Sequence, residues 1–171
     1  MSILTIGHST RTLEDFLGIL RAYGVGRIVD VRTIPRSKRH PQFNQDVLSE
    51  SLRGSGIDYV SMRQLGGFRH PTTDSLNLGW RNLSFRGFAD YMQTQEFFIA
   101  IDDLLRVAEV DSTAIMCSEI LPWRCHRSLI ADSLVVRGIE VEHIMTLTSR
   151  RKHILTKWAR VEKKQITYPK R

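Results

Sequence analysis

Both cysteines of this 171-residue chain lie within one short stretch, MCSEILPWRCHRSL. Cys117 and Cys125 flank Glu119, and His126 and Arg127 follow directly after the second cysteine. Thiols, carboxylates, imidazoles and guanidiniums are the groups that nucleophilic, acid–base and anion-binding chemistry uses. We therefore interpret this stretch as a candidate site rather than as a chance grouping in the core.

The two cysteines have different expected roles. Cys125 begins a predicted helix and lies between Arg124 and Arg127. A helix N-terminus and nearby cations lower the pKa of a thiol, so this position favours a functional cysteine. Cys117 ends an apolar run, and a free cysteine there is commonly a core residue. Their separation of eight residues allows a disulfide but does not require one.

A phosphatase-type loop, of the kind that thiol phosphatases or sulfur-transfer enzymes use, is one reading of the stretch. Such a loop places a cysteine at a strand end and an arginine at the next helix, with backbone amides between them. Cys117 precedes Arg124 by one residue more than the C-x5-R spacing of cysteine phosphatases. Glu119 would repel an anion, and Pro122 supplies no amide donor. The sequence therefore disfavours this reading.

A metal site is a second reading, with Cys117, Cys125, His126 or His8 and a carboxylate as ligands. The chain has no CxxC pair. Adjacent residues on a helix also point about 100° apart, so Cys125 and His126 do not converge on one ion. We assign no metal ligand from the sequence, and any cofactor stays unknown.

General acid–base chemistry is the third reading and conflicts with nothing in the sequence. Glu119 or Asp30 would transfer protons, while His8 and Arg32 would place an anionic substrate.

Alternating strand and helix patterns predict a single α/β domain over residues 1–148. The expected sheet has five mainly parallel strands with helices on both faces, because right-handed crossovers place helices there. The predicted strands are 3–9, 27–32, 57–62, 112–119 and 139–147. The first predicted helix begins after a cap at Thr10 or Thr12, and the others cover 45–56, 97–108 and 126–138. Residues 64–87 show no period and predict a long loop, and we expect its residues 68–86 to close over the site.

Residues 149–171 form a second, basic segment, which we predict to contain a helix over 149–164. From residue 145 onward the chain has nine Lys and Arg against one acid, whereas the remaining 16 basic and 17 acidic residues nearly cancel. Such a tail attracts nucleic acid, or it is simply a solvated helix. The candidate nucleic-acid contacts are Arg150, Arg151, Lys152 and Lys157.

The composition predicts a cytoplasmic protein without a membrane partner. No apolar run approaches the length of a membrane span, and the N-terminus lacks the features of a signal peptide. Two cysteines are too few for a disulfide scaffold, which favours a reducing compartment.

Ligands of parallel sheets bind beyond the carboxyl ends of the strands, and four of the five predicted ends carry reactive or small residues. We expect these ends to meet. The candidate catalytic residues are Cys125, Cys117, Glu119, His8 and Asp30. The candidate substrate-binding residues are Arg32, Arg36, Ser37, Gly66, Gly67 and Arg127.

Six motifs in order resemble the DUF488 family from about residue 3 to residue 145: TIGHST, DVRTIPRS, HPQFN, LGGFRH, GWRNLSFRGFADYM and MCSEILPWRCHR. The resemblance implies a compact α/β domain whose two characteristic cysteines match Cys117 and Cys125. It also carries over onto Gly7, His8, Asp30, Arg32, Pro35, Ser37, Phe43, Gly66, Gly67, Glu119, His126 and Arg127. The family is named for an unknown function, so the resemblance implies no reaction.

We interpret the chain as an enzyme acting on an anionic, phosphate-containing substrate, such as a nucleotide or nucleic acid, at the carboxyl edge of the sheet. Guanidinium groups suit phosphate. Two alternatives stay open: a nucleic-acid-binding accessory protein without catalysis, and a thiol redox or metal-binding sensor.

Overall fold

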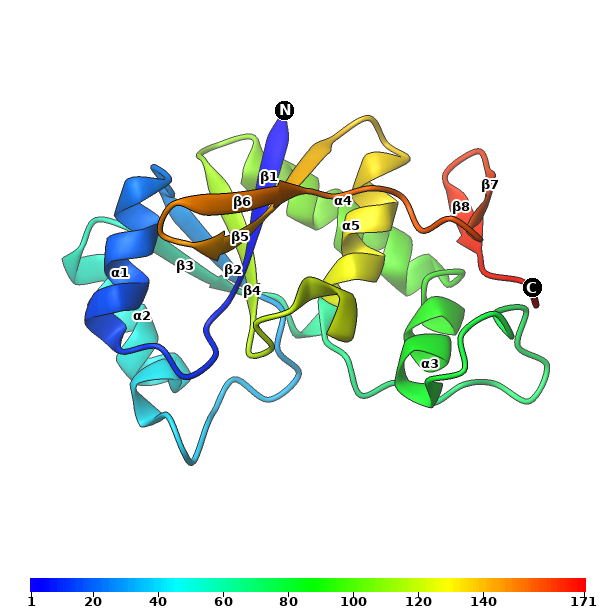
Figure 1. The fold of residues 1–171 in the computed structure, drawn as a ribbon, viewed down its shortest axis with the longest axis horizontal. Helices are drawn as coiled ribbons and strands as arrows, with labels where there is room; N and C mark the ends of the chain where they lie inside the picture. Colours follow the sequence, from blue (N-terminus) through cyan, green and yellow to red (C-terminus); the bar gives the residue numbers. More distant parts are fainter.

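The computed structural model describes residues 1–171 and has a six-stranded sheet at its centre (Figure 1). The strand order is β3-β2-β4-β1-β5-β6. All neighbours pair in parallel except β5 and β6. The strands are β1 Ser2–Gly7, β2 Arg27–Asp30, β3 Asp58–Ser61, β4 Thr113–Cys117, β5 Glu140–Thr146 and β6 Ser149–Lys152. The predicted α/β class and mainly parallel sheet are confirmed, and β6 is an additional antiparallel strand.

Five helices and three short 3-10 turns connect the strands. The helices are α1 Leu13–Ala22, α2 Gln45–Gly54, α3 Leu83–Tyr91, α4 Gln95–Ala108 and α5 Arg127–Val135. The 3-10 turns are η1 Pro41–Phe43, η2 Arg63–Leu65 and η3 Pro122–Arg124. Thr12 caps α1 by accepting a hydrogen bond from the backbone N–H of Asp15 at 3.1 Å, as an N-cap residue does. None of the helices is both long enough and apolar enough to cross a membrane.

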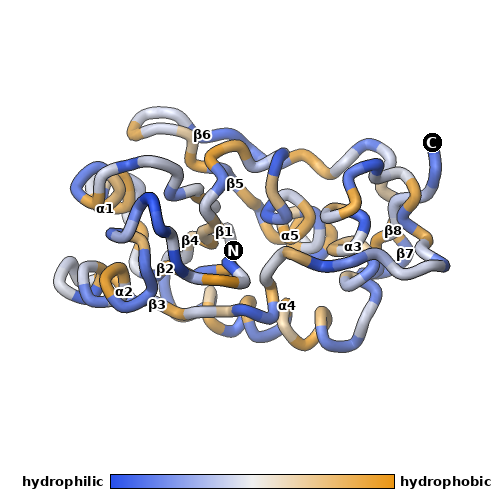
Figure 2. Tube along the Cα trace, turned by 90° about the horizontal axis from the view of Figure 1, so that it is seen from below, coloured by the Kyte–Doolittle hydropathy of each residue, from blue (hydrophilic) through white to orange (hydrophobic).

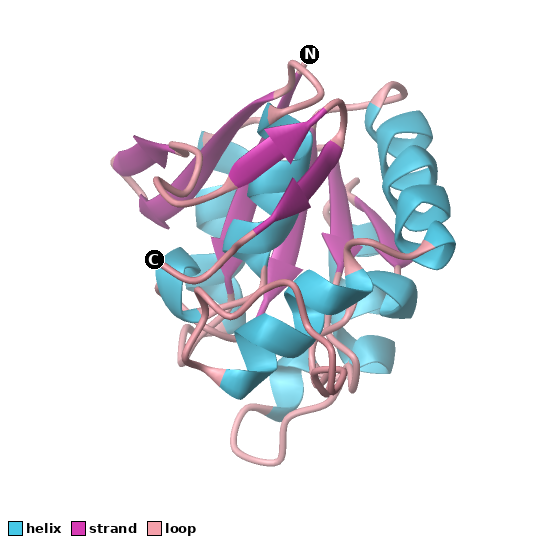
Figure 3. Cartoon of the chain, turned by 90° about the vertical axis from the view of Figure 1, so that its right-hand side faces the viewer, coloured by secondary structure: helices cyan, strands magenta, loops and turns pink.

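Helices cover both faces of the sheet (Figure 3), and the side-chain alternation of the strands separates two cores. On β4, Ala114 and Met116 pack with α1 and α2, whereas Ile115 and Cys117 pack with α3, α4 and α5. Figure 2 shows apolar and polar residues alternating along α1 and α2, as expected for helices with one face on a sheet.

The topology opens a crevice at the carboxyl end of β4. The chain leaves β1 and β2 toward the helices of one face, and it leaves β4 toward α5 on the other face. Because β4 lies between β1 and β2, its loop diverges from both neighbouring loops. Such switch points are where open α/β sheets bind ligands.

The predicted helix over residues 149–164 is wrong. This segment instead forms β6, an irregular stretch and the two-stranded sheet of β7 Arg160–Glu162 and β8 Gln165–Thr167. β6 pairs with β5, which would otherwise be the exposed edge of the main sheet. The buried side chains of Ile166 and Tyr168 then attach the end of the chain to the α3–α5 core. Tertiary pairing therefore overrides the helical spacing of the apolar residues.

The predicted long loop ends earlier than expected, because α3 begins at Leu83. Residues 66–82 do lack regular secondary structure. Asn82 caps the helix by accepting hydrogen bonds from the N–H groups of Ser84 at 2.9 Å and Phe85 at 3.1 Å. An asparagine before an apolar segment is a helix-start signal, so this boundary was readable from the sequence.

Gly7 allows the loop after β4 to approach the end of β1. A Cβ atom at Gly7 would collide with the backbone carbonyl of Glu119, whereas a Cβ at Gly18, on α1, would contact nothing within 4 Å. We expect Gly7→Ala to lower the free energy of unfolding by about 1–3 kcal/mol, as overpacking does. Gly18→Ala is the matched control and should raise it by about 0.5–1 kcal/mol. Denaturant unfolding of both variants tests the contact, and equal stabilities would contradict it.

Candidate functional site

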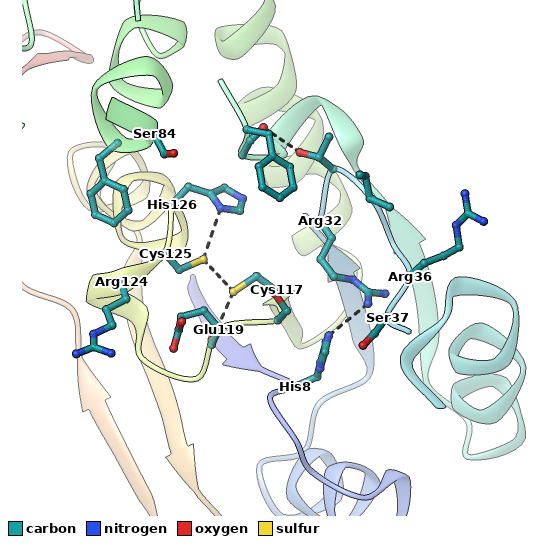
Figure 4. Close-up of a pocket in the computed structure, with 16 residues that line it drawn as sticks. His8, Arg32, Arg36, Ser37, Ser84, Cys117, Glu119, Arg124, Cys125 and His126 are labelled. Atoms are coloured by element: carbon teal, nitrogen blue, oxygen red, sulfur yellow. Dashed lines mark hydrogen bonds between the residues drawn. The ribbon is translucent and has the colours of Figure 1, made fainter. Parts of the chain in front are cut away.

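A pocket of about 510 Å³ lies at the crevice beside β4. Figure 4 shows its lining side chains arriving from the ends of several strands and from the start of α5. The lining residues are His8, Arg32, Thr33, Ile34, Arg36, Ser37, Gly67, Phe68, Ser84, Phe85, Cys117, Ser118, Glu119, Arg124, Cys125 and His126. Eight residues that the sequence nominated therefore lie around one cavity: His8, Arg32, Arg36, Ser37, Gly67, Cys117, Glu119 and Cys125.

The two cysteines are in contact at the floor of this pocket (Figure 4). Cys117 is the last residue of β4 and Cys125 ends the turn that contains η3. Their Sγ atoms are 2.9 Å apart, and both cysteines are free and buried. The backbone N–H of Arg127 also donates to Cys125 Sγ at 3.4 Å. A strand end and a helix start thus bring the thiols together although eight residues separate them.

The pair has one thiol that ionises readily and one that does not. The pKa of Cys125 is lowered well below its usual value, chiefly because the Cys117 thiol donates a hydrogen bond to it. His126 and the positive charge of Arg127 lower it further. Burial is the main reason that the pKa of Cys117 is raised, and the neighbouring Cys125 thiolate adds to this. Of the two thiols, Cys125 is therefore the one that ionises first.

His126 has a defined orientation between the pocket and the core. Its Nε2 atom lies 3.0 Å from the carbonyl oxygen of Val31. Since a carbonyl only accepts, Nε2 carries a hydrogen, which leaves Nδ1 facing Cys125 Sγ at 3.5 Å. Gly67 makes room for this ring, because a Cβ there would lie 3.2 Å from Nδ1. A cysteine and an imidazole in this relation can exchange the thiol proton.

Arg127 lies behind the thiols and does not line the pocket. Its guanidinium is fully buried and donates to the carbonyl oxygens of Glu119 at 2.8 Å and Ile120 at 3.3 Å, and to Thr5 Oγ1 at 3.2 Å. No carboxylate pairs with it. A buried cation without a carboxylate favours negative charge nearby, and Cys125 is the thiol whose ionisation supplies it.

Arg32 enters the pocket from the loop after β2 and is held by Asp30. Asp30 is fully buried, outside the pocket lining, and bonds the guanidinium through two oxygens at 2.7 and 2.9 Å. The hydroxyl of Tyr59 donates to the same carboxylate at 2.5 Å. This fork geometry leaves Arg32 Nη1 for other acceptors. Asp30 therefore orients Arg32 and has no direct path to a ligand in the pocket.

His8 accepts a hydrogen bond from the Nη1 atom of Arg32. Arg32 Nη1 lies 3.3 Å from His8 Nε2, while His8 Nδ1 lies 2.9 Å from the carbonyl oxygen of Ser9 and therefore carries the hydrogen. The ring stacks on Phe43 at 4.2 Å. Burial lowers the pKa of His8 to about 4, so the ring is neutral near pH 7.

The other nominated residues have different surroundings. Glu119 lines the pocket and its Oε1 accepts from the N–H of Leu121 at 3.2 Å. Ser37 lines it too, but its hydroxyl accepts from the N–H of His40 at 3.0 Å. Gly66 lies outside the lining and allows close approach to Thr33.

Several lining residues were not among the candidate catalytic or substrate-binding residues. His126 entered the sequence analysis as a metal ligand and a family position, and Arg124 entered it as the arginine of the phosphatase-type loop. Ile34 and Phe68 form an apolar rim and are 58% and 76% exposed; Phe68 belongs to the loop that was expected to close over the site, whereas Ile34 was given no role. The pocket thus combines cations, a thiolate and an apolar edge.

The turn between the cysteines does not form a phosphatase-type ring of free amides. The N–H of Leu121 bonds to the Glu119 carboxylate, and those of Arg124 and Cys125 bond to carbonyl oxygens within the turn. The structure also contains no group of three or more His, Cys, Asp or Glu side chains with the geometry of a metal site. The phosphatase-type reading therefore lacks a geometric basis.

The basic residues nominated for nucleic acid lie outside this pocket. Arg150, Arg151 and Lys152 are on β6, and Lys157 follows in the irregular stretch. Arg150 pairs with Glu142 at 3.2 Å and Lys152 with Glu140 at 3.4 Å.

Comparison with known families gives one match. Residues 12–134 match the family described as domain of unknown function DUF488, which is more than half of the chain. The chain belongs to the DUF488 family. Both cysteines, Arg32 and His126 of this DUF488 protein lie within the matched range, whereas His8 and the basic segment lie outside it. Comparisons with curated proteins and with solved structures found no match.

We expect Cys125, but not Cys117, to react with iodoacetamide at pH 6–7, because only the thiolate reacts and the Cys125 pKa is lowered. Mass spectrometry of each cysteine-containing peptide across pH 5–9 measures this. The lowered pKa also predicts a stabilisation that is fully present above the unfolded thiol pKa and is lost as the pH falls through the folded pKa.

Substitutions of Cys117 supply the control for this reactivity. Cys117→Ala removes the thiol that donates to Cys125, so the Cys125 pKa should rise and the rate of Cys125 alkylation at pH 6.5 should fall. Cys117→Ser keeps a hydroxyl donor at this position and should therefore retain more of the alkylation rate. A normal titration of Cys125 near pH 8.5, or identical profiles for the two variants, would contradict the pairing.

Proposed function

We propose that this DUF488 protein is an enzyme that uses the Cys125 thiolate as a nucleophile on a small phosphate-containing substrate. The observation that carries the proposal is the contact of Cys125 with the Cys117 thiol at 2.9 Å, in a pocket lined by three arginines. A depressed thiol pKa beside specific partners in a cleft is typical of functional cysteines.

The arginines would bind the anionic part of the substrate. Arg32 is pre-oriented by Asp30, so little side-chain entropy is lost when the Nη1 hydrogen that does not face His8 binds a phosphate oxygen. Arg36 and Arg124 are exposed at the pocket margin, and neither forms a salt bridge with a carboxylate, so both would add positive charge for the substrate. The apolar edge at Ile34 and Phe68 suits an uncharged part of the same molecule.

The covalent step would form a bond between Cys125 Sγ and the electrophilic atom of the substrate. The bond to the leaving group breaks at the same time, and the leaving group takes a proton from Glu119, the carboxyl group in the lining. Water then attacks the adduct, Glu119 takes the proton of that water, and Cys125 leaves again as the thiolate. His126 Nδ1 would take the thiol proton when Cys125 ionises and return it when the thiol forms again.

His8 and Asp30, nominated from the sequence as proton donors or acceptors, take positioning roles in this proposal. Asp30 is enclosed by Arg32 and Tyr59, and both ring nitrogens of His8 have partners. Arg127 would stabilise the thiolate through its charge and hold the turn through carbonyl oxygens, instead of binding substrate directly.

The first test is protection of Cys125 from iodoacetamide by inorganic phosphate, pyrophosphate and AMP at low ionic strength. We expect protection, because the anion would bind beside the thiolate. Arg36→Gln should weaken protection by roughly five- to tenfold, about the effect of a charged hydrogen bond. Arg39→Gln is the matched control, because Arg39 is exposed on the same loop but lies outside the pocket lining. Absence of protection by all three compounds, or equal effects of both substitutions, would reject the anion site.

A dithiol redox function is the second candidate, and the 2.9 Å contact of the thiols favours it specifically. In that case the Cys125 thiolate attacks a disulfide substrate, which forms a mixed disulfide and releases one half of the substrate as a thiolate. Cys117 then attacks Cys125 Sγ, forms the Cys117–Cys125 disulfide and expels the half that was still bound, and an external dithiol reduces the pair again. Cys117→Ser separates the two candidates. It should preserve nucleophilic turnover of a phosphate-containing substrate and abolish catalytic reduction of a disulfide such as oxidised glutathione.

A further inference from the structure

A second pocket, of about 460 Å³, lies on a different part of the surface from the cysteine site and shares no lining residue with it. It forms where the chain after β6 passes over α5 toward β7 and β8 (Figure 1). We call it the tryptophan pocket. Its lining residues are Trp80, Pro122, Trp123, Ser128, His143, Arg151, Lys152, His153, Ile154, Leu155, Thr156, Lys157 and Trp158.

All three tryptophans of the chain line this one pocket. Trp80 and Trp158 meet edge to face with ring centroids 5.0 Å apart. Their indole Nε1 atoms are both buried and have no hydrogen-bond partner in the protein. Trp123 is 49% exposed, which is unusual for so large an apolar side chain. The exposed ring of Trp123 indicates a surface suited to a ligand with a ring of its own.

The same pocket is positively charged. Arg151, Lys152 and Lys157 line it, and no acidic residue does. Lys152 pairs with Glu140, whereas Arg151 and Lys157 have no carboxylate partner. The guanidinium of Arg151 lies over one face of the Trp123 ring, 5.1 Å from the ring centroid, in a cation–π contact.

A buried hydrogen-bond chain holds the wall of the pocket in place. Thr5 Oγ1 bonds to His143 Nδ1 at 2.6 Å, His143 Nε2 to His153 Nδ1 at 2.9 Å, and His153 Nε2 to Asp132 at 2.8 Å. The N–H of Thr156 donates to the same carboxylate at 3.1 Å. Because these bonds link the segment after β6 to β1, β5 and α5, the pocket exists without a ligand and needs little reorganisation to bind one.

We propose that the tryptophan pocket binds a nucleoside phosphate unit, with the base against the tryptophans and the phosphate at Arg151 and Lys157. Aromatic side chains interleaved with cations are the features with which proteins hold single nucleotides and unpaired strands. The unit can come from a free nucleotide or from one residue of a single strand, and both share the same chemistry. This inference goes beyond the proposed reaction at Cys125 and does not depend on it.

Intrinsic fluorescence is a direct readout, because every tryptophan lies at the proposed site. Three probes are titrated into the full-length protein at low salt: AMP, ribose 5-phosphate and a ten-residue oligodeoxyadenylate. We expect AMP to change the fluorescence and to bind at least about fivefold more tightly than ribose 5-phosphate, which is the low end for one stacked base. Equal affinities of AMP and ribose 5-phosphate would overturn the stacking role, and no binding of AMP or the oligonucleotide would overturn the proposal.

Paired charge variants test where the binding occurs. Arg151→Gln with Lys157→Gln removes two positive charges from the pocket, and Arg160→Gln with Lys164→Gln removes the same two charges from exposed tail positions outside it. We expect only the first pair to weaken binding, by about tenfold or more. Equal losses in both pairs would mean diffuse attraction by the basic segment and would overturn the pocket.

Two further variants complete the design. Trp123→Leu keeps an apolar side chain but removes the exposed ring. It should weaken the binding of AMP without weakening the binding of ribose 5-phosphate. Unchanged binding of AMP would contradict the stacking geometry. Cys125→Ser should leave AMP-induced fluorescence unchanged, whereas a loss of that signal would place the binding at the cysteine site instead. Binding of the oligonucleotide but not of AMP, lost only in the pocket pair, identifies a nucleotide within a strand as the ligand.

Discussion

A fully buried guanidinium without a carboxylate partner organises the centre of this protein. Arg127 fixes the turn after β4 through the carbonyl oxygens of Glu119 and Ile120, and it joins the turn to β1 through Thr5. Burying such a charge costs several kcal/mol unless polar groups and opposite charge surround it. The carbonyl oxygens supply the first, and an ionised Cys125 supplies the second. The same guanidinium therefore fixes the shape of the turn and adds to the acidity of the Cys125 thiol, whose main cause is the hydrogen bond from Cys117.

The position of β4 makes this arrangement possible. β4 lies between β1 and β2, and the loops that follow these three strands diverge. Of the three, only the loop after β4 leads to a helix, α5, on the face where Cys117 packs. Gly7 allows the turn to lie against β1, and Gly67 leaves space for His126. Without these two close approaches the thiols, the imidazole and Arg32 would not border a common cavity. The backbone geometry at two glycines is thus as important to the site as its reactive side chains.

The end of the chain connects the two pockets structurally while keeping them chemically distinct. β6 covers the edge of the main sheet, and the hydrogen bonds of His143 and His153 to Thr5 and Asp132 run through the interior between β1 and α5. Thr5 also receives the bond from Arg127, so one hydroxyl touches both the support of the cysteine site and the wall of the tryptophan pocket. The buried polar network therefore supports the turn of the cysteine site at one end and lines the tryptophan pocket at the other.

The sequence by itself determined the α/β class, the five parallel strands, the DUF488 membership and the gathering of strand-end residues, because these follow from local hydrophobic periods and from motifs contiguous in the chain. Only the tertiary structure decided that the thiols touch, that Arg127 is buried behind them, and that Asp30 faces Arg32 instead of the cavity. The strands of the basic segment were likewise invisible locally, since β6 forms by pairing with an edge strand and Trp158 joins Trp80 across the fold. Side-chain direction, burial and cross-chain pairing depend on contacts between residues distant in sequence, which local periodicity does not contain.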